Sequence, residues 1–316
     1  MEYAVRQELD VREQPRIHLG ELQREYTIVR KCCRCILNRV PLRRRAAHAA
    51  PRISRKDSVL ADSVLVRNLR RQGVRIDRRA ATLWFERGAL SSQEMVEFAR
   101  LADRGIRDIE RWLQVPAARR RARKGKIFYF ISNQVEISHA RRRTIFLPLF
   151  RVRNRSAPYL HETFHLLVKC AHCPLWFSEG MACYAQSYVS EHFGGYDGAI
   201  FTRGGNRGVD VDAAGWLSRR EGKAVLPFLG AEGEPPSLFR DRHNVATPFY
   251  VLSHSFVKFL ARRFTAAKLN MLAVARNFEQ SFEAASGKTP LEWKKDWLAS
   301  LANRRGKRET PPKTIV

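Results

Sequence analysis

The sequence predicts an α+β domain that is mostly helical and carries a small mixed sheet. Helical periodicity continues through several long segments, whereas the apolar runs of strand length are short and few. The chain has 316 residues, 44% of them hydrophobic and 10% aromatic, so it can bury a sizeable core. It contains no run of roughly eighteen apolar residues, so a membrane-spanning helix is not predicted.

Residues 1–62 show no sustained period and are predicted to form a basic, disordered N-terminal arm. The alternative is that they are translated sequence ahead of the folded part. Arg43 to Arg52 is rich in Arg and Ala, but no apolar run follows, as a secretory signal would require. Acidic residues such as Glu8 argue against an organelle presequence. By default we therefore expect a cytoplasmic protein.

Residues 63–125 are predicted to lead into the main domain. The run 80–86 has the composition of a strand or its edge. Ser91 and Glu94 form a capping box, which predicts a helix that extends to about Gln114.

Two further strands are predicted at 126–132 and 144–150, both rich in Ile and Phe. Pro148 cannot donate a hydrogen bond to a neighbouring strand, so the second strand is expected at the edge of the sheet.

Two helices are predicted next, from about Pro158 to Lys169 with Ser156 as N-cap, and from about Leu175 to His192. His161 and His165 are four residues apart and lie on one face of the first helix. The break between the helices allows the second to pack back against the first.

Glu179 lies near the start of the second helix, so it can approach the two histidines. Imidazole nitrogens and a carboxylate suit Zn²⁺, and three protein ligands leave a fourth position for water, as in catalytic sites. Glu162, directly after the first histidine, is expected to face that water as a general base.

The motif His161-Glu162-x-x-His165, followed by Pro-Leu-Trp-Phe-Ser-Glu-Gly-Met-Ala at 174–182, resembles the gluzincin metallopeptidases. The most similar branch is the peptidase MA-like family, whose second helix carries a Pro-x-Trp-Leu-x-Glu-Gly-x-Ala signature. The resemblance covers roughly residues 80–303. It implies a zincin-like catalytic domain, zinc bound by the two histidines and Glu179, and an edge strand beside the metal that pairs with extended substrate. Plain packing is the alternative role of that strand.

One departure from thermolysin concerns Cys183, which stands one turn after Glu179, where thermolysin has an aspartate. The residue that orients a ligand histidine is therefore not identified from the sequence. Cys183 itself has the spacing of a small packed residue. Cys170 and Cys173 have no second matching pair, so a local disulfide or two buried thiols is favoured over a structural zinc site.

Residues 196–246 are rich in Gly, Pro and charge and are predicted to form an irregular covering segment. Residues 247–303 follow as C-terminal helices. Tyr250 and His254, one turn apart on the first of them, are candidate donors to the oxyanion of a peptidase reaction. Polar-tipped packing within an apolar helix is the alternative for both.

The formal charge of +27 is uneven: residues 1–160 carry 37 Lys and Arg against 16 Asp and Glu, and residues 161–316 carry 21 against 15. Neither of the basic runs Arg119–Lys126 and Arg141–Arg143 contains an aromatic residue for base stacking, so nucleic-acid binding is only an alternative. A second alternative is a non-catalytic metal-binding protein, which the retention of Glu162 disfavours.

The sequence thus predicts a zinc-dependent peptidase that hydrolyses amide bonds of a peptide or protein substrate through a metal-bound water. The predicted division of the chain is 1–62, 63–125, a zincin core at 126–195, 196–246, 247–303 and a basic tail at 304–316.

Overall fold

A computed structural model describes residues 55–114, 125–168, 170, 172–196, 202, 205–233 and 245–306, all within the unit Arg55–Val316. The predicted N-terminal arm as far as residue 54, most of the basic connection before Lys126 and the tail from residue 307 lie outside the described residues. The first described helix begins at Arg55, so residues 55–62 of the predicted arm are helical and not disordered.

The first half of this unit combines strands and helices in the order α2 (Arg55–Gln72), β1 (Val74–Asp77), β2 (Ala81–Phe85), α3 (Ser92–Trp112), β3 (Ile127–Ser132), β4 (His139–Arg141), β5 (Thr144–Pro148), α5 (Leu149–Arg153) and α6 (Tyr159–Leu167). In the second half the described residues form helices and no strand: α7 (Leu175–Phe193), α8 (Gly205–Leu217), α9 (Arg220–Val225), the 3₁₀ turn η1 (Leu226–Phe228), α10 (Thr247–Ala261), α11 (Ala266–Ala273), α12 (Phe278–Ser286) and α13 (Pro290–Gly306). The architecture is therefore mostly helical with one small mixed sheet.

The five strands are arranged in the order β1-β2-β3-β5-β4. The three central strands are parallel, and β1 and β4 run antiparallel to their neighbours. Central strands are covered on both faces, which explains why β2 is buried at every residue and is apolar at every position except Thr82. All three predicted strands are present.

The prediction that the strand containing Pro148 lies at the sheet edge is wrong. β5 lies between β3 and β4, and the short strand β4 forms the edge. Pro148 is tolerated because β4 pairs with β5 only from Thr144 to Phe146, so the proline lies beyond the end of that ladder. Both β4 and β5 contact α6, so an edge strand does run beside the helix that carries the histidines.

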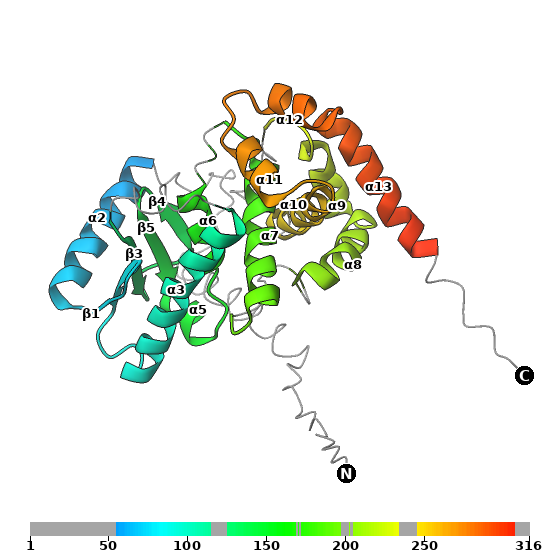
Figure 1. Ribbon diagram of the computed structural model, residues 1–316. Coiled ribbons are helices and arrows are strands. Elements are labelled where there is room, and N and C mark those ends of the chain that lie inside the picture. Colours follow the sequence, from blue (N-terminus) through cyan, green and yellow to red (C-terminus); the bar gives the residue numbers. More distant parts are fainter. Residues whose placement is uncertain are drawn as a thin grey trace, which may run out of the picture. The chain divides into compact units, whose positions relative to one another are not determined.

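The two faces of the sheet are covered by different helices, as Figure 1 shows. Leu65 and Leu69 of α2 pack with Trp84, Phe130 and Phe146 on one face. On the other face α3 and α6 cover the sheet and join the main core. The predicted capping box at the start of α3 is confirmed, since Ser91 and Glu94 each hydrogen-bond the other's backbone N–H.

The helical half is built around α7 and α10, which pack closely along each other. Trp176 stacks on Phe256 and Phe256 on Trp297, with ring centroids 4.8 and 5.2 Å apart. This column joins α7, α10 and α13 through buried aromatic rings, which contribute more to stability than their area alone.

Residues 196–246 are less irregular than predicted, since α8, α9 and η1 form there. The high glycine content of α8 gave no helical prediction for these residues, but Val209 and Ala213 of this helix are fully buried. Packing of α8 against α7 and α10 thus overrides weak intrinsic helix propensity. Among the described helices, none combines the length and the apolar character needed to cross a membrane.

Candidate metal centre

The two histidines of α6 meet at their Nε2 atoms, which lie 3.1 Å apart. Their rings have centroids 4.7 Å apart and are almost perpendicular, at 78°. This is the arrangement that a four-residue spacing on a helix predicts, because residues i and i+4 lie one above the other.

The helix α6 is fixed by contacts with elements on both sides of it. The prediction that Ser156 caps its start is wrong, because the helix begins at Tyr159. The backbone N–H of His161 instead donates to Gln186 Oε1 of α7 at 3.2 Å. On the sheet side, the hydroxyls of Tyr129 and Thr163 are 2.7 Å apart. The first histidine is thus held between β3 and α7.

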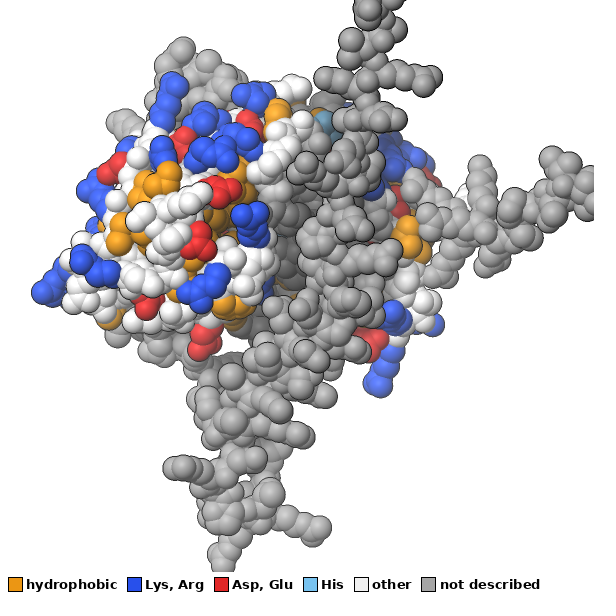
Figure 2. Space-filling view, turned by 90° about the horizontal axis from the view of Figure 1, so that it is seen from below, with side chains coloured by type: hydrophobic (Ala, Val, Ile, Leu, Met, Phe, Trp, Pro, Cys, Tyr) orange, Lys and Arg blue, Asp and Glu red, His pale blue; other side chains and the backbone are white. Residues whose placement is uncertain are grey.

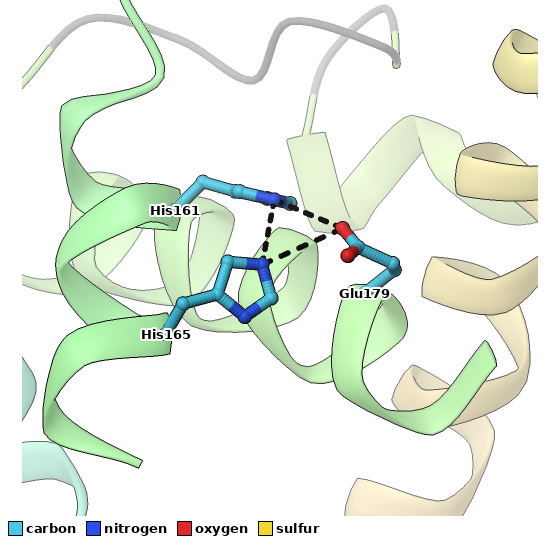
Figure 3. A group of neighbouring side chains, drawn as sticks. All are labelled: His161, His165 and Glu179. Carbon is cyan, nitrogen blue, oxygen red and sulfur yellow. Dashed lines mark hydrogen bonds and ion pairs between the residues drawn. The ribbon is translucent and has the colours of Figure 1, made fainter. Parts of the chain in front are cut away.

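The third residue of the group arrives from α7, which follows the break in the chain predicted after α6. Pro174 precedes the helix, and Glu179 lies in its second turn. Its Oε2 atom is 3.1 Å from Nε2 of His161 and 3.5 Å from Nε2 of His165 (Figure 3). Three side chains from two helices therefore point at one place.

These separations can be compared with what zinc requires. Four ligand atoms at about 2.0–2.1 Å from a central ion, placed at the corners of a tetrahedron, are about 3.3–3.4 Å from one another. The three observed separations are 3.1, 3.1 and 3.5 Å. Among the described residues, this is the group of His, Cys, Asp and Glu side chains that is able to hold a metal ion. The donor set and its spacing therefore fit Zn²⁺.

The electrostatics of the group favour a positive charge at this point. Burial alone lowers the pKa of His165, but the adjacent Glu179 carboxylate raises it to about 9. Burial acts to raise the pKa of Glu179, yet His165 and His161 hold it well below its ordinary range. The side chains remain 8%, 21% and 14% exposed for His161, His165 and Glu179, so solvent reaches the group.

Glu162 follows His161 on α6 and is buried. Burial raises the pKa of its carboxyl, and the two neighbouring histidines offset part of this effect. A carboxylate with a raised pKa takes up a proton more readily than an exposed one.

The other ring nitrogens of the histidines face α7, a feature that sequence reasoning missed. Nδ1 of His161 lies 3.6 Å from Sγ of Cys183, and Nδ1 of His165 lies 3.5 Å from Oγ of Ser178. The sequence did offer a signal for these contacts: Ser178 directly precedes Glu179, and Cys183 follows it by four residues, about one helical turn. Burial raises the pKa of the Cys183 thiol well above its ordinary value, so the sulfur stays protonated.

The two predicted oxyanion donors are placed differently. The ring of Tyr250 is 6.0 Å from that of His161, centroid to centroid. His254 is buried, with Nε2 only 2.7 Å from Oδ1 of Asn206. The structure thus brings Tyr250 to the group and engages the Nε2 atom of His254 elsewhere.

The thiols of Cys170 and Cys173 in the loop between α6 and α7 are not joined in a disulfide. They hydrogen-bond with each other, and this lowers the pKa of Cys170. Both also hydrogen-bond with Ser178, so this loop is attached to the start of α7.

No protein-family model and no curated protein matches the chain. A solved structure that is similar to it is the crystal structure of a mutant M1 zinc metallopeptidase from Deinococcus radiodurans, with 14% identity and a TM-score of 0.40. The match covers 71% of this chain and 50% of that chain, so it spans half of that peptidase.

Proposed function

We propose that this chain is a zinc-dependent peptidase with a zincin-like catalytic domain of the gluzincin type. The observation that carries the proposal is the triangle of His161, His165 and Glu179, whose ligand atoms have the separations of three corners of a zinc tetrahedron. The His, His and Glu donor set suits a catalytic rather than a structural site, because structural sites have four protein ligands.

Each residue then has a defined task. His161 and His165 would bind zinc through Nε2, and Glu179 would bind it through a carboxylate oxygen. Zinc, when bound there, supplies a Lewis acid that polarises a peptide carbonyl and lowers the pKa of water towards about 7. Glu162 takes the proton from the attacking water and passes it to the leaving amine. Tyr250 donates a hydrogen bond to the developing oxyanion.

The test combines metal analysis with two substitutions. The purified wild type should contain one zinc per chain and cleave peptides or unfolded protein. Glu162→Gln keeps the size of the side chain but removes the base, so it should retain zinc and lose most of the activity. Glu179→Gln should lose zinc as well. A wild type that binds no zinc at stoichiometric concentration would overturn the proposal.

A second candidate function, association with nucleic acid, is favoured by one structural observation. Because β2, β3 and β5 are parallel, the turns that precede them lie at one end of the sheet. These turns bring together basic side chains from distant parts of the sequence, namely Arg78, Arg79, Lys126, Arg142 and Arg143. Such a cluster can neutralise phosphates.

The surface as a whole weakens this second candidate. On the face shown in Figure 2, Lys and Arg side chains are spread over the described part and interspersed with Asp and Glu. At the sheet end, Asp77 pairs with Arg75 and Lys126 at 2.8 and 3.2 Å, which reduces the local charge. A dispersed basic surface is therefore the simpler description.

The salt dependence of retention on DNA decides between a phosphate-binding cluster at the sheet end and a dispersed basic surface. If the sheet end binds phosphates, reversing the charge of the exposed Arg79 and Arg142 to Glu should lower the salt-dependence slope by about two. The matched control reverses the exposed Arg220 of α9 and the exposed Arg276 between α11 and α12. Equal loss in both double variants would mean that only net charge matters.

A further inference from the structure

The side chains that lie beside the Nδ1 atoms of the two histidines come from one helix. Nε2 of each ring faces Glu179 of α7, and each Nδ1 faces a different residue of the same helix. There Cys183 Sγ lies 3.6 Å from Nδ1 of His161, and Ser178 Oγ lies 3.5 Å from Nδ1 of His165. The same helix thus supplies Glu179 and the groups behind both histidines.

A histidine that binds a metal through Nε2 carries its remaining proton on Nδ1, and that proton needs an acceptor. The thiol sulfur and the serine hydroxyl can both accept it, the sulfur only weakly. If the thiol instead donated to Nδ1, the ring would carry its proton on Nε2 and could not bind the ion. The tautomer that binds zinc is therefore the one in which Cys183 accepts.

We propose that Cys183 is a positioning residue of this centre: it accepts the Nδ1 proton of His161 and holds the Nε2 atom towards the ion. Ser178 does the same for His165. The inference rests on the proposed zinc site and extends it, because it assigns to a thiol a task that carboxylates and carbonyls usually perform.

The competing account is packing. Cys183 is buried, with 6% of the residue exposed, so it also fills space between α6 and α7. Valine cannot accept a hydrogen bond and is larger than cysteine by roughly one methyl group. Serine is smaller, yet its oxygen is a stronger acceptor than sulfur. Both substitutions change the packing, so the thermal stability of the metal-free variants reports the packing, and their zinc affinity reports the hydrogen bond.

The experiment measures the zinc dissociation constant by competition with a chromogenic chelator, for wild type, Cys183→Val and Cys183→Ser. The positioning role predicts about ten- to hundredfold weaker binding for Cys183→Val and binding within a few-fold of wild type for Cys183→Ser. Ser178→Ala provides a second arm, with weaker binding expected. Thermal unfolding of the metal-free variants shows that each is folded.

Two outcomes separate this inference from the proposed function. If wild type binds zinc and Cys183→Val binds it equally tightly, the positioning role is overturned while the peptidase proposal stands. If wild type binds no zinc at stoichiometric concentration, the proposed site itself fails, and this inference fails with it. Weaker binding by Cys183→Val together with restored binding by Cys183→Ser supports the role.

Discussion

At the residue scale, Tyr250 gives the most direct test of how the transition state of the proposed reaction is stabilised. It lies in the first turn of α10, with its ring 6.0 Å from that of His161. Tyr250→Phe removes only the hydroxyl. If that hydroxyl serves the oxyanion, kcat should fall by about a hundredfold while KM changes little, because the bond forms mainly in the transition state.

Steady-state peptide hydrolysis provides the measurement for Tyr250→Phe. Tyr184→Phe is a matched control, since Tyr184 belongs to α7 and its ring lies 6.3 Å from that of His254. It should leave kcat unchanged. Equal kcat in wild type and Tyr250→Phe would remove Tyr250 from the mechanism.

His254 makes a different residue-level prediction, about stability. Burial lowers its pKa to about 3 from an ordinary value of 6.5. The unfolded chain therefore binds a proton between these pH values that the folded chain does not, so the folded state loses stability as pH falls below 6.5. The expected loss is about 1.4 kcal/mol for each pH unit.

Urea unfolding at pH 7.0 and 5.5 tests this against His254→Gln, which does not titrate and can still hydrogen-bond with Asn206. All other ionisable groups are common to both proteins, so the difference in their pH dependence reports His254 alone. Wild type should lose about 1.4 kcal/mol more than the variant over this range. Parallel pH profiles would contradict a buried, neutral histidine.

At the element scale, the close approach of α7 to α10 depends on Gly180, the residue after Glu179. A Cβ atom at this position would lie 2.5 Å from the carbonyl oxygen of Ser253 and 2.6 Å from Cγ2 of Val257. A backbone oxygen cannot turn aside as a side chain can. Gly180→Ala should therefore push the helices apart and reduce the free energy of unfolding by about 1–3 kcal/mol.

Gly215 of α8 is the matched control for this prediction, because a Cβ atom there meets no atom within 4 Å. Gly215→Ala should be neutral or should stabilise by up to about 1 kcal/mol through helix propensity. Urea unfolding of both variants gives the comparison. A similar effect in both would show that helix propensity, and not contact between α7 and α10, decides the result.

The elements differ in how well their sequences predict them, for identifiable physical reasons. Where local signals decide, as in the capping box of α3 or the start of α7 after Pro174, the prediction agrees with the structure. Within the predicted C-terminal helices, α11 and α12 are two separate helices, because the side chain of Asn277 caps the start of α12. The helix α8 was missed because its stability comes from burial against distant helices.

The same distinction applies to the candidate site. The spacing of His161 and His165 is local, so the sequence predicts their convergence directly. The approach of Glu179 needs only that two consecutive helices pack together. The partner of His254 is Asn206, 48 residues away, and no local pattern indicates such a contact. Long-range hydrogen bonds of this kind depend on the complete packing of α8 and α10.

At the scale of the whole molecule, the site lies where the two halves of the described unit meet. The helix α6 packs on the sheet through β4 and β5, and α7 packs on the C-terminal helices through α10. An ion held by both helices therefore ties the sheet to the helical half. Binding of zinc should consequently stabilise the described unit as a whole and not only the loop between the ligands.

Thermal unfolding with and without a chelator tests this link. Zinc at a hundred times its dissociation constant stabilises the state that binds it by about 2.7 kcal/mol, which corresponds to roughly 5–10 °C for a domain of this size. Wild type should therefore unfold at a higher temperature with zinc than with a chelator, in one transition reported by both near-UV and far-UV circular dichroism. Glu179→Gln should show no such shift, because it lacks the ligand from α7. A shift of the same size in Glu179→Gln would mean that zinc stabilises the chain from a place other than the junction of α6 and α7.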